Sequence, residues 1–170
     1  MCIRDRPESS LRAGAFGLPI TYAIIGGNPR RFTRNIEIYK SVAASYGHNP
    51  DNLPVAVHSW GYVAETDEEA KRDFFPPLKA YHDTLGRERG WPEFDQNMFE
   101  REIGPNGAIY LGSPETVAEK IIDTVETLGL SRFMIHTPVG SMPHEYVMKS
   151  IRLFGERVKP CLLYTSPSPR

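Results

Sequence analysis

Residues 112–136 constrain the fold of this chain more than any other stretch. Ser113 is suited to cap the free N–H groups of a first helical turn, and Pro114 suits the first helical position because proline has no N–H to leave unpaired. Gly129 supplies a left-handed stop, and residues 132–137 form a mostly apolar run short enough for a strand. The apolar residues of the intervening segment share one helical face: Val117, Ile121, Val125 and Leu128. The stretch therefore predicts a helix that feeds a buried strand, which is half of a βαβ repeat.

The same unit recurs along the chain. Four short apolar runs are expected to be strands, at residues 18–25, 55–64, 108–111 and 132–137. Because a helical pattern follows each run, we expect a parallel α/β sheet with right-handed crossovers. Two architectures fit: a small doubly wound sheet, or the C-terminal part of a (β/α)8 TIM barrel, which typically needs about 250 residues. The doubly wound alternative is weakened because neither G-x-G-x-x-G nor the P-loop pattern occurs.

Caps and breaks place the helices. A short helix is expected at residues 7–16, and a second runs from Asn28 to about Tyr46 with an apolar face of Phe32, Ile36, Tyr39, Ala43 and Tyr46. A capping box at residues 66–69 opens a helix that is predicted to break at Pro76-Pro77 and to restart there. Residues 86–107 are interpreted as a polar, lid-like insertion with one short helix around residues 95–103. The last helix, from about residue 144 to 158, is expected to bury Val147, Ile151, Phe154 and Val158.

The two ends of the chain are interpreted as sequencing-adapter scars. Residues 1–6 read MCIRDR and residues 161–170 read CLLYTSPSPR, and both can be encoded by one DNA string read on opposite strands. Such scars are excluded from fold reasoning, which leaves residues 7–160 as the C-terminal portion of a domain. Both cysteines lie in the tails, so the interior can form no disulfide and no thiolate metal site.

The charge of residues 7–160 argues against nucleic acid as a partner. They hold 17 basic and 20 acidic residues, a net charge of about −3, and no basic stripe. No apolar run approaches the roughly 20 residues that a membrane-spanning helix needs. We therefore expect a protein of the cytoplasm that binds neither nucleic acid nor membrane.

Four segments carry a resemblance to a known family. They are IIGGNPRRF at residues 24–32, AVHSWGYVAETDEEA at 56–70, GSPETVAEKI at 112–121 and RFMIHTPVGSMPHEYVMKSIRLFGERVKP at 132–160. In this order they resemble the luciferase-like flavin-dependent oxidoreductases, the bacterial luciferase superfamily of barrel monooxygenases and reductases. The resemblance covers residues 7–160 and corresponds to the C-terminal part of the family's domain.

This resemblance implies a cofactor, partners and a missing half. The implied cofactor is reduced FMN, or a deazaflavin in some branches, acting on a small organic substrate. The implied partners are a flavin reductase and, in the full-length protein, further copies of the chain. In this family most flavin-phosphate contacts reside on N-terminal strands that are absent here. Two alternatives therefore stay open: a non-catalytic truncated product, and a complete small α/β ligand-binding domain.

In a barrel the ligand lies at the C-terminal ends of the strands, and the first candidate residues follow a strand in this way. Gly26 and Gly27 present backbone without side chains, which permits close approach of a flavin or phosphate; an ordinary strand–helix turn needs glycine equally often. Arg30 and Arg31 open the next helix, where they either pair with a phosphate or simply lie in solvent.

Two histidines are candidates for proton transfer or flavin contact. His58 lies in the longest expected strand, on the face that also carries Trp60 and Tyr62, and a hydrogen-bonded core histidine is the competing interpretation. His136 and Thr137 end the last strand, so one of them is expected to face a pocket.

The remaining aromatic and histidine residues have weaker assignments. Trp60, Tyr62 and Trp91 are able to stack on a planar ligand, although packing is the commoner role of such residues. His144 is expected to cap or pack the final helix. The histidines are too scattered for a motif such as H-E-x-x-H, so no metal is predicted. The chain also lacks the G-x-S-x-G motif, which argues against a serine hydrolase.

Overall fold

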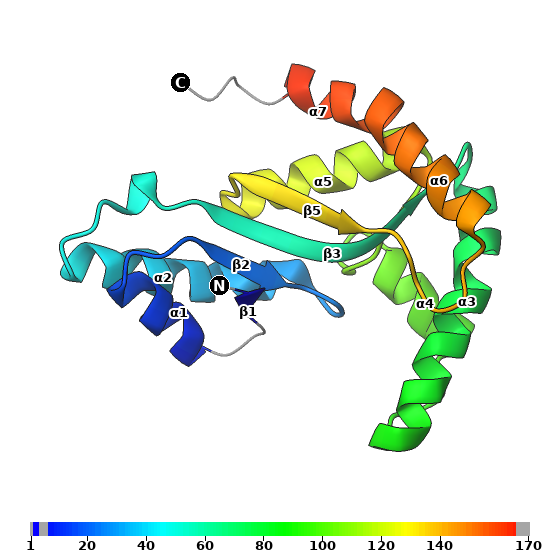
Figure 1. Cartoon of the computed structure of the whole chain (residues 1–170), viewed down its shortest axis with the longest axis horizontal. Coiled ribbons are helices and arrows are strands. Elements are labelled where there is room, and N and C mark those ends of the chain that lie inside the picture. The colour runs from blue at the N-terminus through cyan, green and yellow to red at the C-terminus, as the bar shows by residue number, and fades with distance from the viewer. Residues whose placement is uncertain (1, 4–6, 166–170) are drawn as a thin grey trace.

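The structure is a computed structural model, and it describes residues 2–3 and 7–165 (Figure 1). Its strands are β1 (Cys2–Ile3), β2 (Ile20–Ala23), β3 (Val55–Val63), β4 (Tyr110–Gly112) and β5 (Arg132–His136). Its α-helices are α1 (Pro7–Ala15), α2 (Thr33–Ser45), α3 (Asp67–Arg89), α4 (Gln96–Ile103), α5 (Pro114–Leu128), α6 (His144–Leu153) and α7 (Lys159–Thr165). Two short 3₁₀ turns, η1 (Pro29–Phe32) and η2 (Pro50–Asn52), and a π-helical segment, η3 (Phe154–Val158), complete the fold.

Strand β3 is the centre of the sheet. It pairs with β2 along one edge and with β5 along the other, and β4 pairs with its last three residues. Strand β1 pairs with the outer edge of β2. Every pairing among the described strands is parallel, as the alternation of strands and helices predicts.

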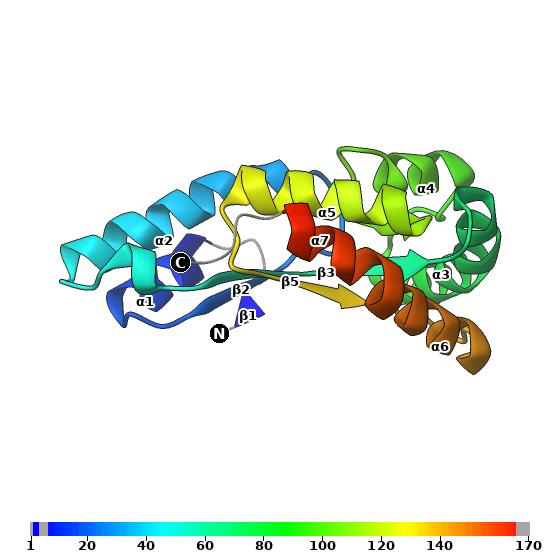
Figure 2. The same cartoon turned by 90° about the horizontal axis from the view of Figure 1, so that it is seen from above.

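One face of the sheet packs against helices. Tyr22, Val57 and Phe133 are in register on β2, β3 and β5, and they join one apolar cluster with residues of α1, α2 and α5. Helices α2 and α5 lie on the same side of the strands (Figure 2). Because side chains alternate along a strand, the neighbouring residues face the other side, and there His58 and Met134 are only half-buried.

Helix α5 confirms the local signals of residues 112–136. The Ser113 hydroxyl accepts a hydrogen bond from the Thr116 N–H at 3.2 Å, which caps the first turn. Gly129 ends the helix in the left-handed conformation, with φ of 61°. Val117, Ile121 and Leu128 are buried, as their spacing predicts.

The predicted break at Pro76-Pro77 is wrong, because α3 runs without interruption from Asp67 to Arg89. Its start is as expected: the Thr66 hydroxyl accepts a hydrogen bond from the Glu69 N–H at 3.1 Å. Proline inside a helix typically costs about 3 kcal/mol, because it removes a backbone hydrogen bond and crowds the preceding turn. Phe74 and Leu78, on either side of the two prolines, are buried in one apolar cluster, and this burial holds the helix together.

Two predicted helix faces are partly wrong. On α2, Tyr46 is 67% exposed because the helix ends at Ser45 and the chain turns away, whereas the other four predicted residues are buried. On the last helix, Ile151 is 51% exposed, and Ser150 and Leu153 are buried instead. The π-helical segment that follows Leu153 changes the helical period. The buried face of α6 is therefore rotated about the helix axis relative to the position of Val158.

The boundaries of the two tails stay a prediction. Cys2–Ile3 form β1, and α7 continues from Lys159 to Thr165 across the predicted boundary at residue 161. The rest of the two predicted tails, residues 1, 4–6 and 166–170, lies outside the described residues. Within the described part of the chain, no helix combines the length and apolarity that a bilayer crossing requires.

Candidate functional site

The carboxyl ends of β2, β3 and β5 bring two of the predicted residues together. Trp60 on β3 is in register with His136 on β5, and His58 lies two residues earlier on the same face of β3. The rings of His58 and His136 are 5.2 Å apart at an interplanar angle of 82°. The Trp60 and His136 rings lie 4.5 Å apart at 83°. The three side chains therefore form one edge-to-face aromatic cluster at the end of the sheet.

His58 is the more sheltered of the two histidines. Burial lowers the pKa of His58, and the neighbouring His136 lowers it further, because a second positive charge there is unfavourable. His58 is therefore held as a neutral imidazole near neutral pH, a form in which one ring nitrogen donates and the other accepts a hydrogen bond. Thr137 is buried, with 6% of its surface exposed.

The Gly26-Gly27 turn is fixed by side chains from two other parts of the chain. Gly27 has φ of 73°, and its N–H donates to both carboxylate oxygens of Glu102, at 3.1 and 3.0 Å. The Arg31 guanidinium donates to the Gly26 carbonyl oxygen at 3.2 Å. No atom lies within 4 Å of the position that a Cβ on Gly26 would occupy. The turn is thus held in place while the space beside Gly26 stays open.

Arg30 lies apart from this turn. Its guanidinium contacts both carboxylate oxygens of Asp123 on α5, at 3.0 and 3.1 Å, and both side chains are more than half exposed. The Asn28 side chain accepts a hydrogen bond from the Arg30 N–H at 2.9 Å and so caps η1. The structure therefore does not bring Arg30 to Gly26, His58 or His136.

A cavity of about 740 Å³ opens beside Gly26 and Trp60. Its floor is the end of β2 and β3, and its walls come from α3, α4 and the loop that joins them. Most of its lining residues are apolar or aromatic, although polar atoms supply much of its surface. The wall residues from the α3–α4 region are Leu78, Tyr81, His82, Leu85, Arg89, Trp91, Phe94, Met98 and Glu102. Tyr62 does not line it, because its ring is buried and its hydroxyl donates to Asp73 at 3.3 Å.

Of these wall residues, sequence reasoning proposed only Trp91 as a ligand contact, and it gave no role to His82 or Glu102. A signal for His82 was present, since Leu78, His82, Leu85 and Arg89 follow helical spacing and all line the cavity. The first three lie in the helix that was predicted to restart at the two prolines. Glu102 had no local signal, because its partner Gly27 is 75 residues away.

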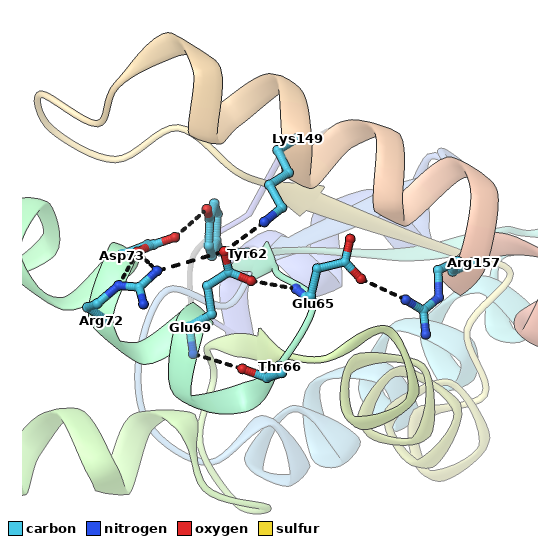
Figure 3. A network of polar contacts seen from close by, with 8 residues as sticks. All are labelled: Tyr62, Glu65, Thr66, Glu69, Arg72, Asp73, Lys149 and Arg157. Atoms are coloured by element: carbon cyan, nitrogen blue, oxygen red, sulfur yellow. Dashed lines mark hydrogen bonds and ion pairs between the residues drawn. The ribbon is translucent and has the colours of Figure 1, made fainter.

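A polar network holds α6 and the π-helical segment against the start of α3 (Figure 3). Lys149 on α6 donates to Glu69 at 2.7 Å, and Arg157 donates to Glu65 at 2.9 Å. The Glu65 N–H in turn donates to the second carboxylate oxygen of Glu69 at 3.0 Å. These contacts secure α6 at the end of the sheet where the cavity lies. His144, at the start of α6, is exposed.

Among the described residues, no three histidine, cysteine, aspartate or glutamate side chains gather in a way that could hold a metal ion.

The comparison with protein families identifies the class. The family model described as luciferase-like monooxygenase matches residues 5–132, so this chain belongs to the luciferase-like monooxygenase family. No curated protein matches the chain.

Solved structures agree with the fold. Monooxygenase RslO1 from Streptomyces bottropensis is 21% identical with a TM-score of 0.71, and the alignment covers 94% of this chain and 47% of that one. The oxygenating constituent of 3,6-diketocamphane monooxygenase from Pseudomonas putida, solved in complex with FMN, is 22% identical with a TM-score of 0.70, covering 94% and 47%. The coenzyme F420-dependent tetrahydromethanopterin reductase from Methanopyrus kandleri is 17% identical with a TM-score of 0.64, covering 94% and 50%.

These likenesses confirm the barrel prediction over the doubly wound one. The chain has the fold of part of a luciferase-like TIM barrel, with parallel strands alternating with helices. It spans about half the length of the solved structures that it matches.

Proposed function

We propose that this chain is the C-terminal part of a flavin-dependent monooxygenase that acts on a small organic substrate. Family membership supports a monooxygenase, and one solved relative of the same fold carries FMN while another depends on coenzyme F420. FMN is therefore the cofactor that we propose, with a deazaflavin as its alternative. A flavin reductase and other copies of the full-length chain are the proposed partners, and the cytoplasm is the proposed compartment.

The observation that carries the proposal is the cavity at the ends of β2 and β3. Its volume of about 740 Å³ falls within the roughly 300–1,000 Å³ of ligand pockets in general. The space beside Gly26 is open, so a flat ring system can approach the backbone there. A side chain at this position would narrow that space. Trp60 and Tyr81, whose rings lie 5.9 Å apart, supply apolar surface for a planar ligand. These residues fit a flavin ring.

The residues of the chain have distinct tasks in this proposal. A bound reduced flavin supplies the reducing equivalents for oxygenation. Gly26 and Trp60 bind and orient the ring, and the walls from α3 and α4 exclude water from it. His58 does not line the cavity but lies two residues before Trp60 on β3, where, held neutral, it can accept or donate a proton through its ring nitrogens, with His136 as its neighbour.

Flavin titration tests the proposal. The chain is compared with a longer version that includes whatever the source DNA encodes upstream, with FMN binding followed by flavin fluorescence and substrate oxidation by oxygen uptake. We expect weak or no binding by the 170-residue chain and one-to-one binding by the longer version. Trp60→Leu should weaken binding in the longer version, whereas Tyr46→Leu, on the exposed end of α2, should leave it unchanged.

Two results would overturn the proposal. Tight one-to-one FMN binding by the 170-residue chain, with a cooperative melt, would identify a complete small ligand-binding domain instead. Failure of the longer version to bind either FMN or coenzyme F420 would rule out a flavin enzyme.

A further inference from the structure

His82 is the polar group of the cavity wall whose chemistry the proposed function does not use. It lies in the fifth turn of α3, and its ring contacts two aromatic side chains of the α3–α4 loop. The ring centroids of His82 and Trp91 are 5.3 Å apart, and those of His82 and Phe94 are 4.8 Å apart, both at an angle of 40°. This double contact fixes the plane of the imidazole, so its two nitrogens point in set directions.

One of these nitrogens is buried without a partner. No described residue hydrogen-bonds to His82 Nδ1, which is shielded from solvent beside Gly86. A buried N–H without an acceptor costs about 1–3 kcal/mol, and unpaired buried N–H groups are rarer than unpaired buried acceptors. We therefore assign the proton of the neutral ring to Nε2 and the bare lone pair to Nδ1.

The second nitrogen faces a different environment. Nε2 makes no hydrogen bond with the described residues, and it is not among their buried unpaired atoms, so it is accessible from outside the ring cluster. His82 lines the cavity, so we take Nε2 as the nitrogen available to a ligand there. The side chain thus presents one neutral N–H donor in a fixed orientation.

Each charged group of the cavity makes a contact within the protein. Glu102 accepts hydrogen bonds from the Gly27 N–H, and Arg31 donates to the Gly26 carbonyl. The Arg89 guanidinium lies over the Trp91 ring at 5.1 Å. Arg31, Arg89 and Glu102 also line the cavity, so a ligand that enters meets charged groups as well as aromatic surface and the His82 donor.

We propose that His82 is a ligand-recognition residue whose Nε2–H donates a hydrogen bond to a carbonyl oxygen of a flat, conjugated ligand in this cavity. The inference rests on the proposed function, in which the cavity takes a planar ligand. Two sources share this chemistry: the flavin ring, which carries carbonyl groups, and an aromatic ketone bound as substrate. Both need a flat cavity and one neutral donor, and neither needs a positive charge.

A matched pair of probes isolates the hydrogen bond. Fluorenone and fluorene have the same flat three-ring frame, and only fluorenone carries a carbonyl oxygen. Binding of each to the 170-residue chain is followed by quenching of tryptophan fluorescence. His82→Phe keeps an aromatic ring between Trp91 and Phe94 but removes the donor. His144→Phe, at an exposed position outside the cavity, is the matched control.

We expect the wild-type chain to prefer fluorenone over fluorene, and His82→Phe to lose that preference by about five- to tenfold, the effect of one hydrogen bond worth about 1 kcal/mol. Fluorene binding should not change, and His144→Phe should behave as wild type. If His82→Phe weakens both probes equally, or changes neither, the inference is wrong. Thermal melts of both variants show whether the fold is intact.

A parallel measurement with FMN shows whether His82 binds the flavin or the substrate, and it tests the inference separately from the proposed function. In the upstream-extended protein, a five- to tenfold loss of FMN affinity in His82→Phe would assign the donor to the flavin ring, and an unchanged affinity would assign it to the substrate. If the extended protein binds no flavin but the fluorenone preference still depends on His82, the inference stands and the proposed function fails.

Discussion

The hydrogen bond between Val63 and Ser150 gives the sharpest test of how the end of the sheet is held. Val55 and Val63 are an even number of residues apart on β3, so their backbone N–H and C=O groups point to the same edge of the strand. On that edge the Val55 carbonyl accepts a hydrogen bond from the Ser131 N–H, beside β5. Strand β5 ends at His136, opposite Trp60, and so leaves the Val63 N–H without a strand partner on that edge. The Ser150 hydroxyl oxygen accepts this bond instead, at 2.8 Å.

Ser150→Ala removes the acceptor and leaves the donor buried. Both residues are almost fully shielded, with Val63 0% and Ser150 1% exposed, so water cannot replace the hydroxyl without rearrangement. An unsatisfied buried N–H costs about 1–3 kcal/mol, and we expect a loss of about 2 kcal/mol in the free energy of unfolding. In a chain of this length that corresponds to a melting temperature lower by about 4–8 °C.

Urea denaturation and amide hydrogen exchange measure this loss. Ser150→Ala should reduce the free energy of unfolding and speed exchange at the Val63 amide. Ser45→Ala is the control, because the Ser45 hydroxyl is exposed at the end of α2, and it should stay within about 0.5 kcal/mol of wild type. If both variants unfold alike and Val63 exchange is unchanged, the reasoning about the uncovered strand edge is refuted.

Three further predictions concern charge and backbone. The hydrogen bond from Lys149 is the largest of the effects that lower the pKa of Glu69 in the folded chain. As the pH falls below 4.5, Glu69 therefore binds a proton more readily in the unfolded chain than in the folded one. The free energy of unfolding should therefore decrease as the pH falls below 4.5, and it should decrease less steeply in Lys149→Met. Urea denaturation at a series of pH values measures this difference. The pKa of His58 should lie below 6.5 in an NMR titration, and His136→Phe should raise it only in part, since burial is the larger cause. Gly27→Ala should lower the free energy of unfolding by about 1–2 kcal/mol in urea, because φ of 73° crowds a Cβ.

Each of these predictions has a result that contradicts it. An unchanged acid slope in Lys149→Met would mean that its contact with Glu69 is not maintained in solution. A His58 titration at or above 6.5 would contradict its burial. Gly26→Ala is the control for Gly27→Ala, because Gly26 has no positive φ and no atom near the Cβ position. Equal losses in the two alanine variants would remove backbone strain as the explanation.

Strands β2 to β5 and helix α5 could be predicted from the sequence because their signals are local, whereas β1 lies in the stretch interpreted as an adapter scar. The Ser113 cap, the Gly129 stop and the apolar run behind them all act within a few residues of their own positions. The apolar face of α5 was correct for the same reason. The positions of the strand ends were less certain: β2 covers Ile20–Ala23 within the predicted residues 18–25, because only this part pairs with β3.

Helix α3 shows where local signals are insufficient. Two adjacent prolines favour a break by several kcal/mol, and sequence reasoning placed one there. The helix continues because Phe74 and Leu78 are buried in the same cluster as Phe94 and Phe99, which come from the α3–α4 loop and from α4. That contact depends on the chain reversing direction after Gly90, which the residues around the prolines do not encode.

The candidate site divides in the same way. His58 and His136 lie together because parallel register brings positions of neighbouring strands side by side; the alternation along β3 predicts the face of His58, whereas the pairing of β5 with β3 is a tertiary contact. The cavity walls were not predictable, because they require an uninterrupted α3 and the long-range bond between Glu102 and Gly27. Strand periodicity thus predicts which face of β3 carries His58 and Trp60, whereas the cavity walls emerge only from tertiary contacts.

The floor and the walls of the cavity contribute differently to ligand binding. The floor at Gly26 and Trp60 sets how closely a flat ring can approach the sheet, and it belongs to the repeating strand–helix unit. The walls around His82 come from the excursion between β3 and β4, in which Glu102 accepts hydrogen bonds from the Gly27 N–H and Arg89 lies over the Trp91 ring. Substitutions in the floor should therefore affect all planar ligands alike, whereas those in the walls should change the preference among them. Selectivity can then vary through the excursion without disturbing the sheet that supports it.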